Sequence, residues 1–273
     1  MPAFPSPRGL PRAARCGVDA FFSNGHAAPP MLRLRAFFTS FFILAFTGFM
    51  SVIAVVLWPL SPRGDLFLKL AQLWSRAIFR VGGIAYQVQV SEKLVPEKSY
   101  LYLSNHESLT DILALYATLP QKVVMVAKRS LFIVPVFSWG MWLAGFIFIN
   151  RRNSREALSK MQSAGKLVKK GRSVLVFPEG TRSDGGNMLK LKRGGFVLAQ
   201  AAQIEVVPVG IGGTAQVLPR DTFPVYPGRI AVCVGDPLPA PLPNEDLPLY
   251  IERVRVEIER LRVSAKQMCQ TTN

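Results

Sequence analysis

Residues 99–117 read SYLYLSNHESLTDILALYA, and they pass from an apolar run through a polar loop into a segment with helical character. Residues 99–103 are aromatic and aliphatic, which is typical of a buried strand. Residues 109–117 predict a helix. The same succession of short β-rich runs and helical runs continues along the chain from residue 84. We therefore predict an α/β domain with a mixed sheet flanked by helices.

Seven strands and five helices are predicted in this domain. The strands are 85–90, 99–103, 123–127, 146–149, 173–177, 204–209 and 230–234, and the helices are 109–117, 135–143, 154–170, 191–202 and 248–263. Helix 154–170 has a clear start, because Asn153 and Glu156 resemble a capping box. The apolar stretch 131–146 is interrupted by Pro135 and Gly140, which favours core or part of an acyl-chain groove over a second membrane span.

An uncharged segment precedes the domain. Residues 36–60, AFFTSFFILAFTGFMSVIAVVLWPL, contain no charged side chain. Since about 20 apolar helical residues cross a bilayer core, the run predicts a membrane-inserted helix, with a buried core helix as the alternative. Gly48 and Trp58-Pro59 leave crossing and re-entry both open. Basic residues lie on both flanks, so the positive-inside rule gives no orientation.

The chain is predicted to have three parts. Residues 1–30 are rich in Pro, Ala, Gly and Arg without an apolar pattern, which predicts a disordered tail. Met31 is a plausible start of translation. Residues 31–83 hold the membrane helix and, over 66–81, an amphipathic helix at the membrane interface or packed on the domain, ended by glycines. Residues 84–273 form the α/β domain.

The composition restricts the classes of partner. The chain is 49% hydrophobic, with a mean hydropathy of +0.25, which fits one soluble domain and one membrane element. There are 33 basic and 17 acidic residues, and the formal charge is +16. This excess predicts an anionic partner: nucleic acid, an anionic membrane surface or a phosphorylated substrate. A solvated basic surface is the alternative. No nucleic-acid-binding motif is recognisable, so no nucleic-acid partner is predicted.

The cysteines and histidines are few. Cys16, Cys233 and Cys269 are far apart and odd in number, so they predict neither a disulfide framework nor a metal site. The histidines are His26 and His106, too few for a histidine-based zinc site. We predict no metal and no cofactor. A reducing compartment is the default expectation for such cysteines. We expect the protein at the inner, cytoplasmic membrane, with its catalytic domain on the cytoplasmic side.

Residues 104–111, SNHESLTD, place a histidine in the loop and an aspartate in the first turn of the predicted helix. Asp111 can then hold one ring nitrogen of His106, while the other takes a proton from a hydroxyl group. A structural histidine with a hydrogen-bonded ring would show the same spacing, so both interpretations stay open at this point.

Three further segments follow predicted strands. Residues 177–183, FPEGTRS, offer a glycine for close approach and an arginine for two-pronged phosphate binding, although a polar turn with a surface arginine has the same pattern. Residues 145–151, GFIFINR, deliver an Asn-Arg pair at a strand end. Residues 206–209, VVPV, read as a buried strand with a proline bend.

The order NHESLTD, GFIFINR, FPEGTRS and VPV resembles the four motif blocks of the glycerophospholipid acyltransferases, most closely the 1-acylglycerol-3-phosphate (lysophosphatidic acid) acyltransferases. The resemblance covers roughly residues 84–235 and the membrane element, and it makes residues 84–273 an acyltransferase domain. It implies transfer of a fatty acyl group from acyl-CoA or acyl-carrier protein to the sn-2 hydroxyl of 1-acylglycerol-3-phosphate, which makes phosphatidic acid. The implied partners are that thioester carrier, the lysophospholipid and membrane lipid.

The resemblance also implies roles for single residues. His106 would be the general base and Asp111 would orient it, with direct attack on the thioester and no acyl-enzyme. The implied acceptor-site residues are Lys128, Asn150, Arg151, Glu179, Gly180, Thr181, Arg182 and Lys192. Ser130 stands where an acidic residue is common in the family, and Asn150 where aspartate is common.

Two alternatives share much of this evidence. One is an acyltransferase for another lysolipid, such as a lyso-ornithine lipid. The other is a non-catalytic lipid-binding protein on the same fold, against which the intact His106 and Asp111 speak.

Overall fold

The structure, a computed structural model, describes residues 29–61, 64–119, 123–150, 153–168 and 171–271. The predicted tail therefore lies outside the described residues, apart from its last two prolines. The described strands are β1 (Ile84–Val90), β2 (Leu101–Ser104), β3 (Val123–Lys128), β4 (Ile147–Ile149), β5 (Ser173–Val176), β6 (Val206–Gly212) and β7 (Gly228–Val234). The described helices are α2 (Pro30–Val56), α3 (Asp65–Gly82), α4 (Thr110–Thr118), α5 (Pro135–Leu143), α6 (Ser154–Val168), α7 (Gly194–Ala202), α8 (Thr214–Val217) and α9 (Leu247–Gln270), with 3-10 turns η2 (Trp58–Leu60) and η3 (Arg129–Ile133).

The strands form one mixed sheet in the order β1-β7-β6-β2-β5-β3-β4. From β6 to β4 all neighbours are parallel, whereas β6 and β7 are antiparallel and β1 is parallel to β7. The carboxyl ends of β6, β2, β5, β3 and β4 therefore meet at one edge of the sheet. In α/β folds this edge is where ligands bind.

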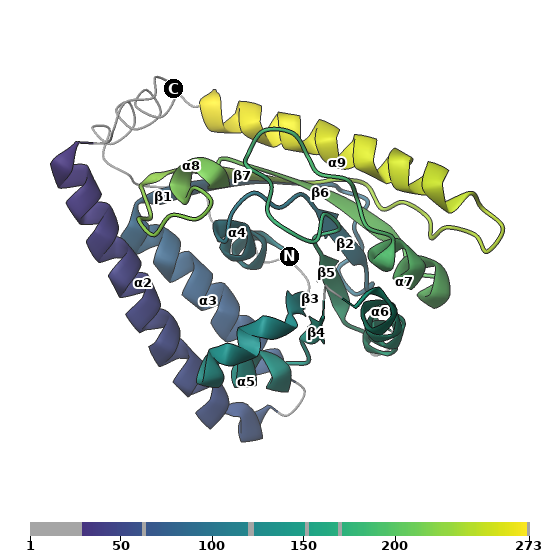
Figure 1. The fold of residues 1–273 in the computed structure, drawn as a ribbon, viewed down its shortest axis with the longest axis horizontal. Helices are drawn as coiled ribbons and strands as arrows, with labels where there is room; N and C mark the ends of the chain where they lie inside the picture. Colours follow the sequence, from purple (N-terminus) through teal and green to yellow (C-terminus); the bar gives the residue numbers. More distant parts are fainter. Residues whose placement is uncertain (1–28, 62–63, 120–122, 151–152, 169–170, 272–273) are drawn as a thin grey trace.

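Helices cover both faces of the sheet (Figure 1), and each face has its own core. Alternate residues of a strand point to opposite faces. Tyr102 accordingly packs with α3, α4 and α5, while Leu101 and Leu103 pack with α6, α7 and α9. The central strands are buried on both sides, which explains why they read as continuous apolar runs.

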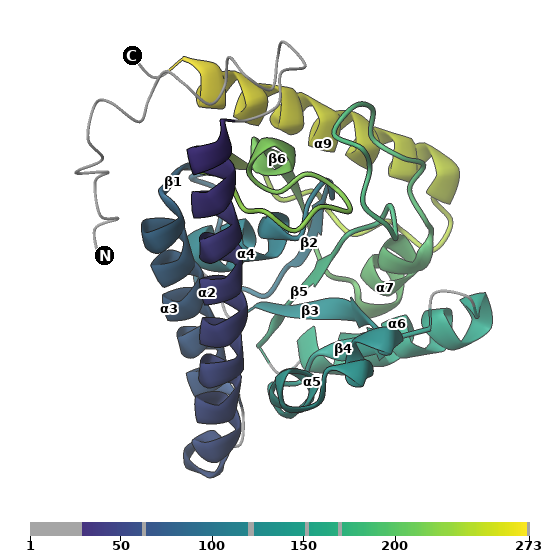
Figure 2. The ribbon, with the colours of Figure 1, turned by 60° about the vertical axis from the view of Figure 1, so that its left-hand side comes forward.

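Helix α2 lies along α3 and α5 at one flank of the domain (Figure 2). Its inward side carries small residues that include Ser40 and Ser51, both buried. Its outward side exposes large apolar side chains: Leu34, Phe37, Phe38, Phe41, Phe42, Leu44, Phe49, Val52 and Val56. Exposed apolar area of this extent is covered by lipid or by protein in its working state. Within the described residues, α2 is the one helix with the length and composition to cross a membrane.

The segment 131–146 is divided between the core and the surface. Met141 and Phe146 are buried, as the core interpretation predicts. Phe132, Ile133, Trp139 and Trp142 are exposed, and α5, which carries the two tryptophans, packs against α2.

Every predicted strand corresponds to an observed strand, and the α/β prediction is confirmed. Several helix boundaries differ. Helix α2 begins at Pro30, so Arg33 and Arg35, basic residues on the amino-terminal flank of the uncharged segment, lie within it. Residues Trp58–Leu60 form a 3-10 turn instead of continuing the helix. Helix α9 continues past residue 263 to Gln270 because Ala265 adds to its buried stripe. Helix α8 was not predicted, since four residues give no periodicity.

Candidate active site

His106 and Asp111 form a hydrogen-bonded pair at the carboxyl end of β2. The Nδ1 of His106 lies 2.8 Å from Oδ2 of Asp111, and both side chains are buried. The same Oδ2 accepts the backbone N–H groups of Glu107 at 2.7 Å and Ser108 at 2.9 Å. An ionised carboxylate only accepts hydrogen bonds, so Nδ1 carries the proton and Nε2 is left as the acceptor. This is the tautomer that a general base needs.

The FPEGTRS loop packs directly against the histidine. The rings of His106 and Phe177 stack with their centroids 4.0 Å apart and an interplanar angle of 13°. The backbone N–H of Ser183 donates to the carbonyl of His106 at 2.7 Å. Strands β2 and β5 are parallel neighbours, so the loops that follow them lie side by side at the carboxyl edge of the sheet and make these contacts.

Glu179 lies beneath this junction. Its Oε1 accepts the backbone N–H of His106 at 2.7 Å, and its Oε2 accepts the backbone N–H of Leu189 at 2.8 Å. Burial raises the pKa of Glu179 to about 7, against the two hydrogen bonds, which lower it. The carboxyl group thus shapes the site by holding two loops together.

The remaining residues of that loop lie nearer the surface. Gly180 has φ +74°, and a Cβ there would lie 2.8 Å from the Cε of Lys192, so the backbone and the lysine meet closely. Thr181 and Lys192 are exposed. The Nη2 of Arg182 lies 3.2 Å from Oδ1 of Asp221, a residue of the loop after α8.

Lys128 and Asn150 lie at the ends of β3 and β4, on the same sheet edge. The order β2-β5-β3-β4 places them two and three strands from His106, or roughly 10 and 14 Å at the usual strand spacing. Lys128 is exposed and Asn150 is half-buried. Arg151 lies outside the described residues. Among the described residues, no three side chains group together as metal ligands.

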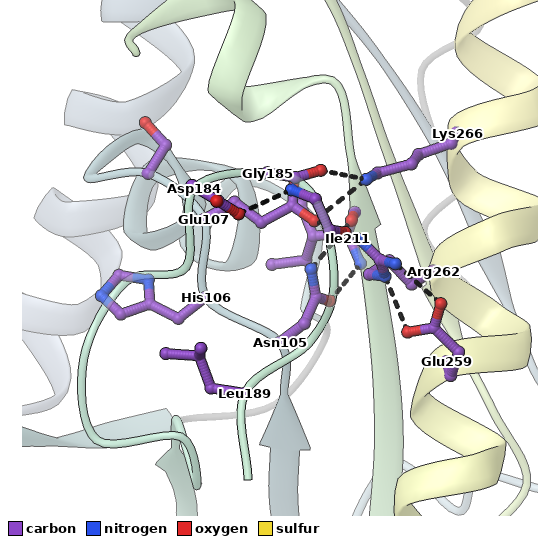
Figure 3. A network of polar contacts seen from close by, with 12 residues as sticks. Asn105, His106, Glu107, Asp184, Gly185, Leu189, Ile211, Glu259, Arg262 and Lys266 are labelled. Atoms are coloured by element: carbon purple, nitrogen blue, oxygen red, sulfur yellow. Dashed lines mark hydrogen bonds and ion pairs between the residues drawn. The ribbon is translucent and has the colours of Figure 1, made fainter. Parts of the chain in front are cut away.

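A buried ionic network behind His106 was not anticipated. Glu107 is 1% exposed, and its Oε1 lies 2.8 Å from Nη1 of Arg262 and 3.2 Å from Nζ of Lys266. Arg262 donates to the carbonyl of Gly186 and Lys266 to that of Gly185. Figure 3 shows Lys266 reaching Gly185 from α9, with Arg262 on the same helix. Helix α9 therefore fastens the histidine loop to the loop that follows FPEGTRS.

The charges of this network support one another. Burial raises the pKa of the Glu107 carboxyl, while Arg262 and Lys266 oppose that shift. The hydrogen bonds that Arg262 donates to Glu259 and Glu107 raise the pKa of Arg262. One signal was present in the sequence: Arg262 interrupts the apolar stripe of Val254, Ile258 and Leu261.

Asn105 is a further residue whose role was not predicted from the sequence. Its side chain donates to the carbonyl of Ile211 at 3.1 Å and accepts the N–H of Ile211 at 2.8 Å. These two bonds continue the pairing of β2 with β6 and fix the start of the histidine loop.

The His-Asp pair and the Gly-Thr-Arg loop thus lie together at the carboxyl edge of the sheet, and both fall in the part of the chain that matches a known family. The family model for Acyltransferase matches residues 85–212. Two relatives extend the match. The bovine 1-acyl-sn-glycerol-3-phosphate acyltransferase alpha is 33% identical, covering 81% of this chain and 78% of its own. A 1-acyl-sn-glycerol-3-phosphate acyltransferase of Chlamydomonas reinhardtii is 32% identical, and the match covers 90% of this chain and 78% of the relative.

The fold has a solved counterpart. The crystal structure of the 1-acyl-sn-glycerophosphate (LPA) acyltransferase from Thermotoga maritima matches with a TM-score of 0.69 and 24% identity, covering 84% of this chain and 96% of that chain. The protein described here belongs to the 1-acyl-sn-glycerol-3-phosphate acyltransferase family.

Proposed function

We propose that this protein transfers a fatty acyl group from the thioester of acyl-CoA or acyl-carrier protein to the sn-2 hydroxyl of 1-acylglycerol-3-phosphate, which yields phosphatidic acid. The observation that carries the proposal is the 2.8 Å contact between His106 and Asp111, because it leaves Nε2 as a proton acceptor. The relatives that match most of the chain are named for this acceptor.

The reaction needs one base and no acyl-enzyme intermediate. The Nε2 of His106 takes the proton of the acceptor hydroxyl as its oxygen attacks the thioester carbonyl carbon. Asp111 stabilises the imidazolium that forms. The tetrahedral intermediate then collapses, the C–S bond breaks, and the leaving thiolate takes the proton from the imidazolium. The products are the new ester and the free thiol, and His106 is neutral again.

The acceptor site is proposed to lie along the same sheet edge. Arg182 binds the phosphate of the acceptor, with Lys128, Asn150 and Arg151 as further polar contacts. Gly180 lets the acceptor approach the backbone, Thr181 borders it, and Lys192 adds positive charge. All of these residues except Arg151 are supported by their position at the carboxyl ends of β5, β3 and β4 or in the loop that packs on Gly180.

We propose that the protein is attached to the membrane by α2, whose outward side is apolar. The location would be the inner, cytoplasmic membrane, with the catalytic domain on the cytoplasmic side. The small number and wide spacing of the cysteines agree with a reducing compartment.

Membranes containing equal amounts of the parent, His106→Ala and Asp111→Asn proteins test this function with 1-acylglycerol-3-phosphate and labelled acyl-CoA or acyl-carrier protein. Loss of a general base should slow transfer about 10²- to 10⁴-fold. Asp111→Asn should lose less, because the ring remains. Lys93→Ala is the matched control, since Lys93 is exposed and follows β1, whose carboxyl end lies at the opposite sheet edge.

A folded His106→Ala protein that keeps more than about a tenth of the parent rate would contradict the role of His106. A parent protein that acylates only another lysolipid, such as a lyso-ornithine lipid, would reassign the acceptor. A parent that binds lysolipids and acylates none would be a lipid-binding protein on this fold.

A further inference from the structure

Residues 218–225, called here the 218–225 loop, connect the catalytic loop with the membrane helix. At one end, Ser108 Oγ donates to the carbonyl of Leu218 at 2.8 Å. At the other end, Ser40 of α2 donates to the carbonyl of Phe223 at 2.7 Å and accepts the N–H of Val225 at 2.8 Å. The Phe223 ring also packs edge-on against Phe37 of α2, with centroids 5.5 Å apart. A lipid held along α2 would therefore meet this loop before it reaches His106.

Two arginines converge on one carboxylate in the middle of the loop. Asp221 Oδ1 lies 3.2 Å from Nη2 of Arg182, and Oδ2 lies 3.2 Å from Nε of Arg220. Arg220 also donates through Nη1 to the carbonyl of Arg182 at 2.9 Å. The two guanidinium groups are thus held side by side from different loops, in the arrangement that recognises an anion with several oxygens.

The carboxylate between them is easily replaced. The Asp221 side chain is 71% exposed, and exposed ion pairs contribute little to stability. Asp221 also has φ +59°, a conformation that non-glycine residues adopt at a cost. A phosphate monoester has more charge and more oxygens than a carboxylate, so it would compete effectively for both arginines.

We propose that Arg220 binds the acceptor phosphate together with Arg182, and that the Asp221 carboxylate occupies the phosphate position when the acceptor is absent. The proposal rests on the proposed function, because it assigns a new contact to the same substrate. The acyl chain of the acceptor would lie against the apolar side of α2, the phosphate between Arg182 and Arg220, and the free hydroxyl toward His106. The 218–225 loop then selects lysolipids that carry a phosphate monoester over lysolipids without a phosphate group.

The kinetic test compares the parent with Arg220→Ala and Arg220→Lys. One lost charge-assisted contact should raise the KM for 1-acylglycerol-3-phosphate about tenfold in Arg220→Ala. The acceptor KM of Arg220→Lys should lie between those of the parent and Arg220→Ala, because lysine keeps the positive charge but cannot make the two-pronged contact of a guanidinium group. The KM for acyl-CoA and the kcat should stay within about twofold of the parent. Arg255→Ala is the matched control, since it removes an arginine that pairs with Glu252 on α9. An acceptor KM within twofold of the parent, or a raised donor KM instead, would overturn the proposal.

Asp221→Asn tests the second half of the proposal. Removal of an internal competitor should leave the acceptor KM unchanged or lower it. A rise as large as that of Arg220→Ala would mean that Asp221 fixes the arginines permanently, and the placeholder role would be wrong.

A binding measurement separates this inference from the proposed function. Micelles of 1-acylglycerol-3-phosphate should raise the thermal unfolding midpoint of the detergent-solubilised parent and of Arg255→Ala, and should raise that of Arg220→Ala much less. Micelles of monoacylglycerol, which lacks the phosphate, should affect all three equally. If the parent transfers no acyl group but shows this dependence on Arg220, the proposed function fails and the phosphate site stands. If the parent is active and the shift is the same without Arg220, the phosphate site fails alone.

Discussion

Replacement of Arg262 by methionine should destabilise the protein and slow acyl transfer together. Arg262 has only 7% of its side chain exposed, and its Nη1 lies 2.8 Å from Glu107 and 2.7 Å from the carbonyl of Gly186. Methionine fills much of the same volume but donates no hydrogen bond. The buried Glu107 carboxylate and the Gly186 carbonyl would both lose a donor.

The loss of stability in Arg262→Met depends on the interactions that Glu107 keeps in the variant. Removal of one partner of a buried ion pair typically costs about 3–5 kcal/mol. Two features reduce the cost here: Lys266 still lies 3.2 Å from Glu107, and burial raises the pKa of Glu107, so that the group can take a proton instead. We expect a loss of about 2–3 kcal/mol in the free energy of unfolding. Glu107→Gln should lower the free energy of unfolding by about 1 kcal/mol or less, because Arg262 keeps its hydrogen bonds to Glu259 and to the Gly186 carbonyl.

The double variant Arg262→Met, Glu107→Gln should recover at least about 1 kcal/mol relative to the sum of the two single losses. Urea unfolding of the detergent-solubilised proteins measures the three stabilities. Transfer rates should fall about tenfold in Arg262→Met, since a small displacement of the loop misplaces His106. A loss below about 1 kcal/mol for Arg262→Met, or a double variant that shows simple additivity, would refute the reasoning.

Two further outcomes are expected. Glu179→Gln should remove a pH dependence of stability. The pKa of Glu179 is raised to about 7 in the folded protein, so the folded state binds the proton more tightly than the unfolded state does. The parent should therefore lose stability relative to the variant as the pH rises from about 4.5 to 7. Unfolding midpoints of both proteins across pH 5–8 measure this, and a constant difference would contradict it. The protein should also stay with membranes through a wash in 1 M salt, which screens surface charge over about 3 Å but leaves the apolar burial of α2 intact; release by salt alone would show that α2 is not inserted.

The local order of the chain determined most of the fold and the centre of the site. Strand and helix positions follow from apolar runs and their periods, which act over a few residues. His106 and Asp111 are five positions apart and need only a loop and one helical turn to meet, so their contact was predictable. The position of the Phe177–Ser183 loop was also predictable, because it directly follows an apolar strand.

Tertiary packing decided the contacts between distant parts of the sequence. Glu107 and Arg262 are separated by 155 positions, and they meet only because α9 packs closely on β6, where a Cβ at Gly210 would overlap the backbone of α9. The pairing of Arg182 with Asp221 depends on α8 and the 218–225 loop, whose course is set by anchors on Ser108 and Ser40. Two further features likewise have no local signal in the sequence. They are the antiparallel pairing of β7 with β6 and the packing of the side of α2 that carries small residues against the domain. The physical reason is that periodicity reports which face of an element is buried, whereas the partner of that face is chosen by the packing of the whole chain.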